Sequence, residues 1–273
     1  MTVYPNAKLN IGLNIVERRA DGYHNIETVF YPIGLHDTIE MEIVNGAEPE
    51  CLLEINGNPI EGAVENNLVV KAYHLLGKDF TLPPVHIRLD KQVPTGAGLG
   101  GGSSDAAYTL KMINDSYCLG LSADQLEAYA VRLGADCPFF INNSPVFATG
   151  IGNVFSPLSL SLKGLHLALI KPDVFVSTRD AYANVTPQHP ANPLPQLIAL
   201  PIEEWRGQVT NDFENSVFPK FPEISAIKER LYERGAVYAS MSGSGSSVFG
   251  FFREAPLFGE EEFKGCFVHT ETL

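Results

Sequence analysis

The chain has 273 residues, of which 45% are hydrophobic and 19% charged, and its formal net charge is −13. This length suffices for one large domain or two ordinary ones, and the composition is that of a globular protein with a sizeable core. The negative charge argues against nonspecific binding to nucleic acid or to an anionic membrane. Binding of a phosphorylated ligand would therefore require locally concentrated cationic or amide groups.

The four cysteines form neither a CxxC pair nor a zinc-binding spacing, so we expect a reduced, cytoplasmic compartment. The first residues do not combine a positive segment with an apolar one, and no apolar run reaches the ~18 residues that a membrane span requires. The sequence therefore predicts neither a signal peptide nor a membrane helix.

Residues 7–16 alternate between apolar and polar side chains, which predicts a half-buried strand. Lys8 and Asn10 stand side by side on its polar face. That face is either simply solvated or part of a functional site, and the pattern leaves both open. A following Asp-Gly turn presents Tyr23 and His24 at a loop edge, where the rings could stack on a nucleobase or be ordinary half-buried aromatics.

Three strands and a helix are predicted next, at residues 28–33, 38–44 and 51–55 and at 67–76, where Asn67 caps the helix. A glycine-rich stretch follows at 93–107 (VPTGAGLGGGSSDAA), between a predicted strand at 85–89 and a predicted helix at 104–113. Glycine permits positive φ and close approach, and the first amides of a helix lack internal partners at the positive end of its dipole. Together these features predict an anion-binding loop, for which phosphate is the usual ligand.

The loop has three other interpretations, namely a Walker A loop, a dinucleotide-binding loop and a plain turn. A Walker A loop requires Lys after its last glycine, whereas Gly102 is followed by Ser103. The GxGxxG spacing at 96–101 matches the dinucleotide fingerprint by letter, but the preceding strand ends in polar residues and no acid follows at the spacing that a ribose requires. A plain turn in which Ser103 or Ser104 caps the helix is the simple alternative.

Ser122 and Gln125 predict a capping box for a helix that Gly134 ends. Asp136 follows between Ala and Cys, directly before an apolar segment at 139–141 that we expect to be a strand. An acid in this setting is poorly placed for solvent. It is either a cap or a buried functional carboxylate.

Helices and strands alternate with mixed spacing in the second half. The pattern predicts strands at 165–170, 236–241, 248–252 and 266–269 and helices at 178–184, 214–218, 223–234 and 258–264. The proline-rich residues 187–201 are predicted to be a surface loop, and a second small-residue loop lies at 242–246. We therefore expect an α+β protein of two layers, and the two loops favour a nucleotide site between two lobes.

Residues 94–104 (PTGAGLGGGSS) resemble the phosphate loop of the GHMP kinases. Further motifs of this family are similar to AKLNIGLNI at 7–15, RADGYH at 19–24, HDTIE at 36–40, LGADCPFF at 133–140 and MSGSGSSVFG at 241–250. The resemblance extends over nearly the whole chain and is weakest at 184–208. It does not depend on the glycines alone.

The resemblance implies an α+β fold of two domains. Residues 1–153 would form a domain similar to ribosomal protein S5 that carries the ATP loop, and residues 154–273 a ferredoxin-like domain, with ATP in the cleft between them. Likeness to a ribosomal protein could suggest RNA binding, but the net charge of −13 argues against it. We expect no nucleic-acid or membrane partner, and either a monomer or a homodimer.

The family's activity implies transfer of the γ-phosphoryl group of ATP to an alcohol, with Asp136 as the base and Lys8 opposite it. A nearby ammonium would keep the carboxylate ionised and stabilise the developing charge. Mg²⁺ would bridge phosphate oxygens, with Ser103, Ser104 and Asp105 as candidate ligands only. The residues expected to hold ATP are Pro94, Thr95, Gly96, Ala97, Gly98, Leu99, Gly100, Gly101, Gly102, Ser103 and Ser104.

The DGYH segment resembles that of family members whose substrate is a cytidine diphosphate conjugate of methylerythritol. Tyr23 and Tyr182 would then stack on the two faces of cytosine, with Tyr182 standing where the family often has Phe, and His24 would read its edge. The residues expected to contact the substrate are Asn10, Tyr23, His24, Thr178, Tyr182, Gly243, Ser244 and Gly245. The residues that flank Thr178 depart from the family pattern.

Three alternative functions are carried forward. One is a different GHMP kinase, acting on mevalonate or homoserine, which would keep the same loop. Another is a nicotinamide dehydrogenase that uses the GxGxxG match. The last is a catalytically inactive nucleotide-binding regulator, against which the presence of both Lys8 and Asp136 argues.

Overall fold

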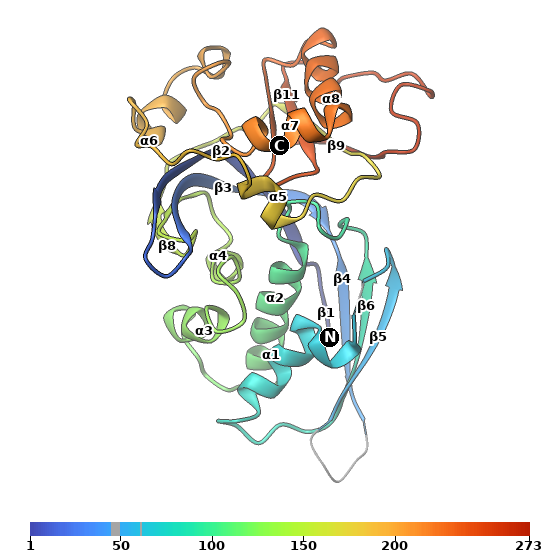
Figure 1. The fold of residues 1–273 in the computed structure, drawn as a ribbon. Helices are drawn as coiled ribbons and strands as arrows, with labels where there is room; N and C mark the ends of the chain where they lie inside the picture. Colours follow the sequence, from blue (N-terminus) through green and yellow to red (C-terminus); the bar gives the residue numbers. More distant parts are fainter. Residues whose placement is uncertain (45–49, 61) are drawn as a thin grey trace. The chain divides into compact units, whose positions relative to one another are not determined.

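The computed structural model describes residues 1–44, 50–60 and 62–273 (Figure 1). Helices and strands are interspersed along the chain, which confirms the α+β class. The chain forms two compact units. Unit 1 comprises Met1–Ala7, Leu35–Thr95 and Gly100–Ser144, and unit 2 comprises Lys8–Gly34, Gly96–Leu99 and Pro145–Leu273. Because each unit combines separate segments, the domain boundary between residues 153 and 154 stays a prediction.

Unit 1 contains a sheet with the strand order β1–β4–β6–β5. Its strands are β1 (Thr2–Val3), β4 (Thr38–Ile43), β5 (Cys51–Gly57) and β6 (Val85–Lys91). β4 is antiparallel to β1 and β6, whereas β5 is parallel to β6. Val85, Ile87 and Leu89 of β6 are buried and alternate with more exposed polar residues, so one face of the sheet is apolar.

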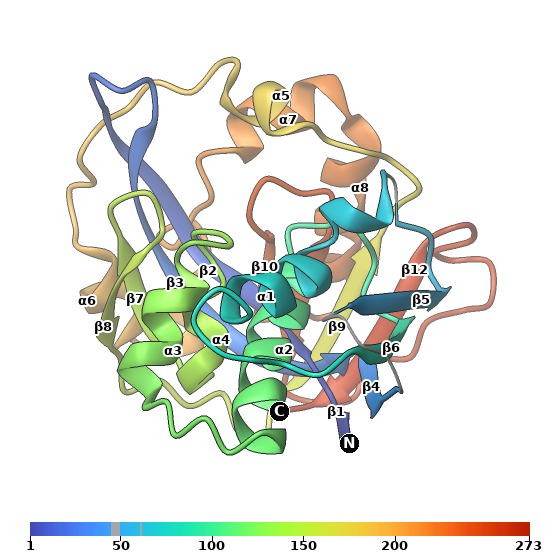
Figure 2. The ribbon, with the colours of Figure 1, turned by 90° about the horizontal axis from the view of Figure 1, so that it is seen from below.

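Among the described residues, unit 1 contains four α-helices and one short 3₁₀ helix. They are η1 (Val64–Asn66), α1 (Leu68–Leu76), α2 (Gly101–Ser116), α3 (Ala123–Ala130) and α4 (Phe139–Asn142). Figures 1 and 2 show α1 and α2 on one side of β4, β5 and β6. Val69 of α1 and Ala106 and Leu110 of α2 are fully buried. The helix that follows the glycine-rich loop is therefore anchored in the core of unit 1.

Unit 2 contains two antiparallel sheets. The first has the order β2–β3–β7–β8 and includes most of β2 (Asn6–Arg18) and β3 (His24–His36), with β7 (Val146–Thr149) and β8 (Val154–Pro157). The second has the order β10–β11–β9–β12, formed by β9 (His166–Lys171), β10 (Tyr238–Met241), β11 (Val248–Phe252) and β12 (Phe267–Thr272). The helices are α5 (Thr178–Tyr182), α6 (Leu194–Ile198), η2 (Ile202–Glu204), α7 (Glu214–Lys220) and α8 (Pro222–Glu233).

The strand predicted at residues 139–141 is wrong, because these residues form helix α4. Pro138 precedes them in a helical conformation, and all three apolar side chains are buried. A short apolar run without alternation does not distinguish a buried strand from a buried helical turn. The strand at this point of the chain begins only at Val146.

The helix predicted at 258–264 is also wrong, because this segment forms turns. The Glu262 carboxylate holds the segment in place by accepting bonds from Arg230, Arg234 and the amide of Gly259. Part of the predicted proline-rich loop is helical, since α6 lies within residues 187–201. The capping box of Ser122 is confirmed.

Candidate active site

The polar face of β2 is buried, so its simply solvated interpretation is wrong. Lys8 and Asn10 are each 3% exposed. The Lys8 ammonium donates to Asn10 Oδ1, lies 3.5 Å from the Gly98 carbonyl oxygen and stands 4.5 Å from the centre of the Phe30 ring. Because a buried charge is costly unless hydrogen-bonded, these contacts offset part of the cost of burying the ammonium.

Asn10 connects this lysine to the second small-residue loop. Its backbone amide nitrogen donates to Ser242 Oγ over 3.1 Å, and Ser242 Oγ donates to the Gly98 carbonyl oxygen over 2.9 Å. The Asn10 side-chain nitrogen donates to Thr28 Oγ1 over 3.1 Å. Sequence reasoning missed Thr28 and Ser242. For Ser242 the signal was its position directly before the predicted contacts Gly243, Ser244 and Gly245.

Residues 96–99 of the glycine-rich loop belong to unit 2 and are fixed there by backbone contacts. The amide of Lys8 donates to the Leu99 carbonyl over 2.9 Å, and that of Ser247 donates to the Ala97 carbonyl over 3.3 Å. Gly98 has φ +75°, and a Cβ added there would lie 2.0 Å from the Ser242 carbonyl oxygen. Glycine is therefore required at this position both for its backbone conformation and for the close approach.

The other half of the loop begins helix α2 of unit 1. Gly100 is the N-cap with φ +72° and provides no side-chain cap, so the interpretation of Ser103 or Ser104 as a cap is wrong. Both serines lie inside the first turn, and the amide of Ser104 donates to the Gly100 carbonyl over 2.9 Å. The preceding amides have no partners within a helix, and the helix dipole adds partial positive charge. This end of α2 is suited to bind phosphate.

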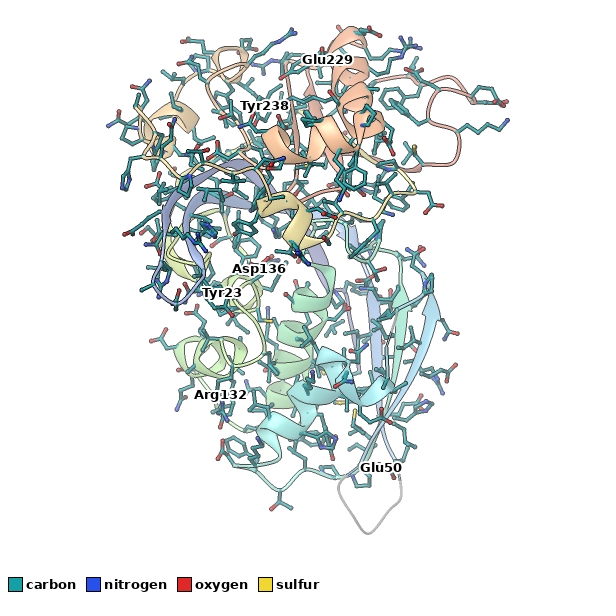
Figure 3. The ribbon with its side chains drawn as sticks, viewed as in Figure 1. Tyr23, Glu50, Arg132, Asp136, Glu229 and Tyr238 are labelled. Atoms are coloured by element: carbon teal, nitrogen blue, oxygen red, sulfur yellow. The ribbon has the colours of Figure 1, made fainter. Side chains whose placement is uncertain are left out.

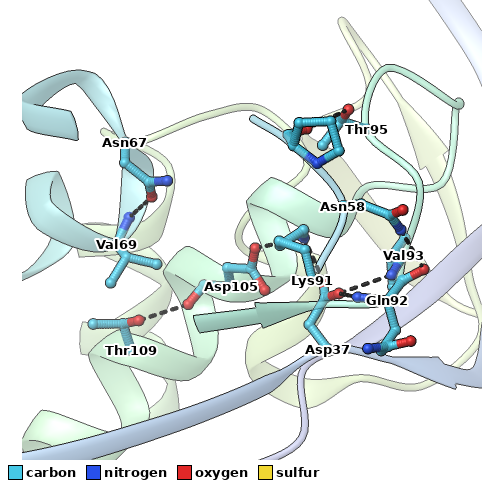
Figure 4. A network of polar contacts seen from close by, with 11 residues as sticks. Asp37, Asn58, Asn67, Val69, Lys91, Gln92, Val93, Thr95, Asp105 and Thr109 are labelled. Carbon is cyan, nitrogen blue, oxygen red and sulfur yellow. Dashed lines mark hydrogen bonds and ion pairs between the residues drawn. The ribbon is translucent and has the colours of Figure 1, made fainter. Parts of the chain in front are cut away.

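A buried ion cluster, which sequence reasoning missed, supports this end of α2 (Figure 4). Lys91 at the end of β6 donates to Asp37 Oδ2 and, over 2.8 Å, to Asp105 Oδ2 of α2. Asp37 Oδ1 also accepts the amides of Gln92 and Val93 over 2.7 and 2.8 Å. The cluster therefore ties the entry of the loop to the helix that leaves it.

The pKa values of Asp105 and Lys91 in this cluster are both raised, but for different reasons. Burial, together with the nearby Asp37 carboxylate, raises the pKa of Asp105 to about 7, although Lys91 opposes the shift. For Lys91 burial disfavours the charged form, but the two carboxylates outweigh it and raise its pKa. Because Asp105 is bonded to Lys91 and almost fully buried, it is poorly placed to act as a Mg²⁺ ligand.

Asp136 lies in the loop between α3 and α4 of unit 1 (Figure 3). It is half-buried, and the residue at the N-cap position of α4 is Pro138. Both interpretations of Asp136, as a cap or as a functional carboxylate, stay predictions. The adjacent Cys137 thiol is buried and hydrogen-bonded with Ser103 in the first turn of α2. Burial raises the pKa of Cys137 to about 11. A carboxylate thus stands next in the chain to a residue that contacts the phosphate-binding end of α2.

An aromatic group lies in unit 2. The His24 and Tyr182 rings stack with centroids 4.7 Å apart, and Tyr182 also packs edge-on against Phe213. The Tyr23 ring is 63% exposed. Burial, with Arg18 nearby, lowers the pKa of His24. The fold therefore brings His24 and Tyr182 together from distant parts of the sequence and leaves Tyr23 open to solvent.

The remaining predicted substrate contacts are also in unit 2. Thr178 is an exposed residue at the start of α5, whose cap is the neighbouring Ser177. Gly243 has φ +55°, and a Cβ there would lie 3.1 Å from Asn10 Oδ1. Gly243 is thus close to the Lys8–Asn10 pair, whereas no such contact is described for Thr178 among the residues of this structure.

The chain can now be compared with known proteins. Residues 67–144 match the family model "GHMP kinases N terminal domain", and residues 196–261 match "GHMP kinases C terminal". The 4-diphosphocytidyl-2-C-methyl-D-erythritol kinase of Bacteroides fragilis is 55% identical over 267 residues, which cover 98% of this chain and 97% of that protein. This chain belongs to the GHMP kinases. The resemblance stated from its motifs is therefore confirmed.

Other GHMP kinases agree. The Bacteroides thetaiotaomicron kinase of the same name is 58% identical over 252 residues, which cover 92% of each chain. A crystal structure of 4-(cytidine 5'-diphospho)-2C-methyl-D-erythritol kinase matches with a TM-score of 0.79 and 30% identity, covering 99% of this chain and 98% of the other. A mevalonate kinase structure, at 15% identity and a TM-score of 0.70 over 99% and 98% of the chains, supports the fold alone.

Membership of this family excludes the nicotinamide dehydrogenase alternative. The sheet explains why the GxGxxG letters misled. β6, which leads into the glycine-rich loop, pairs antiparallel with β4 and parallel with β5, so it lies in a mixed sheet, whereas dinucleotide folds place this loop in a mostly parallel sheet with helices on both faces. None of the helices in the described part of the chain is both long and apolar enough to cross a bilayer.

Proposed function

We propose that this GHMP kinase transfers the γ-phosphoryl group of ATP to the C2 hydroxyl of 4-diphosphocytidyl-2-C-methyl-D-erythritol. The products are ADP and the 2-phosphate, in the non-mevalonate route to isoprenoid precursors. Relatives of this name at 46–58% identity over nearly the whole chain support the substrate. The structural observation that carries the proposal is the contact between Cys137, the neighbour of Asp136, and Ser103 in the first turn of α2.

Asp136 is the general base of the proposed reaction. An alcohol is a poor nucleophile near neutral pH, and a carboxylate that accepts its proton as the new bond forms contributes about 10²–10⁴-fold. Lys8 stabilises charge that develops on the attacking oxygen. Its ammonium is oriented by Asn10, whose own contacts reach the loop at Gly98 through Ser242.

The phosphates of ATP are held by the loop at 94–104. Its backbone is fixed on one side by contacts with Lys8 and Ser247 and on the other by the cluster around Lys91. Phosphoryl transfer requires mainly positioning and charge neutralisation, so a rigid set of amides is what this step needs.

Mg²⁺ fits this site as a companion of ATP. Among the described residues no group of three His, Cys, Asp or Glu side chains is placed to hold a metal ion. Mg²⁺ commonly uses substrate phosphates and water with only one or two protein ligands, so such a set is not required. When bound, it would neutralise phosphate charge, and the half-buried Ser103 at the start of α2 is the candidate ligand, whereas the candidate Ser104 is fully buried like Asp105 and equally poorly placed.

Recognition of the cytidine end is assigned to unit 2. The exposed Tyr23 ring stacks on cytosine, and the His24–Tyr182 pair provides a second aromatic surface with a hydrogen-bonding edge. Thr178, Gly243, Ser244 and Gly245 complete the substrate contacts. We place the enzyme in the cytoplasm, because its four cysteines are free thiols. A monomer or a homodimer stays the expected oligomeric state.

The test is an ADP-release assay with ATP, Mg²⁺ and the cytidine substrate, with mevalonate and homoserine in parallel. Turnover is expected with the cytidine compound alone. Turnover with another alcohol instead would retain the family and discard the substrate.

The same assay tests the base. Asp136→Asn should lower kcat by about 10²–10⁴-fold while ATP still binds, because only the proton acceptor is removed. ATP affinity is measured by calorimetry on the same preparation. A variant with nearly normal kcat would show that Asp136 is not the base.

A further inference from the structure

A chain of buried hydrogen bonds in unit 2 runs from Lys8 to the backbone of strand β2. Lys8 Nζ donates to Asn10 Oδ1, Asn10 Nδ2 donates to Thr28 Oγ1 over 3.1 Å, and Thr28 Oγ1 donates to the Gly12 carbonyl oxygen. Lys8, Asn10 and Gly12 are on β2, and Thr28 is on its neighbour β3 (Figure 1). Thr28 is fully buried.

The direction of each bond in this chain follows from its last two members. A carbonyl oxygen can only accept, and a hydroxyl has a single hydrogen, so Thr28 gives that hydrogen to Gly12. Thr28 can then meet Asn10 only as an acceptor. It therefore selects the NH₂ side of the Asn10 amide, and the amide oxygen is left to face Lys8.

The opposite orientation of the amide would be unfavourable at both ends. It would set the Asn10 oxygen against the lone pairs of Thr28, and its NH₂ group against the Lys8 ammonium. Lys8 and Asn10 are each 3% exposed and Thr28 is fully buried, so water does not compensate for such a mismatch. The Thr28 hydroxyl on β3 thus determines which atom of the Asn10 side-chain amide faces the Lys8 ammonium.

We infer that Thr28 is a positioning residue for phosphoryl transfer, which orients the Asn10 amide and through it the Lys8 ammonium. This inference rests on the proposed function, because it gives Lys8 a part in the reaction. Thr28 itself touches neither substrate nor nucleotide in this assignment. Its contribution is to hold the Asn10 side-chain amide, which contacts Lys8, in one of its two possible orientations.

The test compares Thr28→Val, which keeps the branched shape but removes the hydroxyl, with Thr28→Ser, which keeps the hydroxyl. For Thr28→Val we expect kcat to fall about 10- to 100-fold and KM for ATP to stay within about twofold, because the phosphate-binding backbone is unchanged. For Thr28→Ser we expect kcat within about threefold of the wild type. Equal losses in both variants would overturn the inference.

A double-mutant cycle shows whether Thr28 acts through Asn10. In an Asn10→Ala background, Thr28→Val should change kcat by less than about twofold, since the amide that it orients is gone. A loss as large as in the wild-type background would show that Thr28 acts by another route and would overturn the inference. Thr28→Ala removes the same hydroxyl and replaces Thr28→Val if that variant does not fold.

A measurement without turnover separates this inference from the proposed function. In ¹⁵N-labelled protein, the Asn10 side-chain NH₂ should exchange with solvent at least about tenfold faster in Thr28→Val than in the wild type or Thr28→Ser. Unchanged exchange would overturn the inference even if the kinase activity is as proposed. Conversely, absence of turnover on the cytidine substrate would refute the proposed function, while the exchange result would still decide the role of Thr28.

Discussion

Two lysines of this protein, Lys91 and Lys8, are buried to nearly the same degree and contact different kinds of oxygen atom. Lys91 in unit 1 is 2% exposed and bonded to the carboxylates of Asp37 and Asp105. Lys8 in unit 2 is 3% exposed and donates to the amide oxygen of Asn10. The Lys91 ammonium compensates two carboxylates of unit 1, whereas the Lys8 ammonium contacts the amide oxygen of Asn10 and lies near the Gly98 carbonyl oxygen.

Lys91 thus has a structural role, whereas Lys8 is the lysine that we propose to act in the reaction. Carboxylates that cancel an ammonium make it part of the scaffold, and its loss leaves those carboxylates buried without compensation. The Asn10 amide oxygen holds the Lys8 ammonium in one position, which suits a group proposed to act on a developing anion. Burial alone would not have distinguished the two lysines.

The largest expected effect comes from Lys91→Met. Breaking a buried ion pair by removing one partner destabilises a protein by about 3–5 kcal/mol. We therefore expect the free energy of unfolding in urea to fall by that amount. Lys8→Met is the matched control, since it removes an equally buried ammonium. Equal stability of Lys91→Met and the wild type would refute the structural role of Lys91.

Lys8→Met should instead act on turnover. Loss of one preorganised group that stabilises transition-state charge lowers kcat by about 10²–10³-fold. The free energy of unfolding should fall by less than in Lys91→Met, because Lys91→Met leaves two buried carboxylates without their shared donor. The ADP-release assay and urea unfolding are run on the same preparations. A kcat of Lys8→Met within a few-fold of the wild type would refute the proposed role of Lys8 in turnover.

The smallest expected effect is a pH dependence of stability. Asp105 titrates near 3.9 in an unfolded chain and at about 7 in the folded protein, so between these pH values the folded state binds more protons. The contribution of Asp105 to the free energy of unfolding is therefore fully present below about pH 4 and is lost as the pH rises through 7. Asp105 faces Lys91 and Asp37 within the cluster, and their responses belong to the same transition.

Asp105→Asn should remove this component. We expect the free energy of unfolding of the variant to fall less between pH 4 and 7 than that of the wild type, by at least about 1.4 kcal/mol, which corresponds to one unit of pKa. Asp115→Asn, at an exposed position of the same helix, is the control and should keep the wild-type slope. Parallel curves for Asp105→Asn and the wild type would contradict the raised pKa of Asp105.

Sequence alone predicted the features that depend on local backbone chemistry. The glycine-rich loop, the alternation of β2 and the capping box of Ser122 are all read within a few residues, because dihedral preferences and hydrogen bonds at helix ends are local. The family motifs led to the GHMP kinases for the same reason. Local pattern failed at 139–141, where a short apolar run is compatible with a strand or a helical turn.

Tertiary structure alone decided which polar groups are buried and what they meet. The partners of Lys91 lie 54 and 14 residues away in sequence, Thr28 lies 18 residues from Asn10, and Ser242 lies 232 residues from it. No local pattern encodes such pairings, because they arise when strands and loops from distant segments close around the same atoms. Sequence predicted the glycine-rich loop and named Lys8 as a candidate site residue, whereas only the packing of the fold showed that Lys91 is buried between two carboxylates.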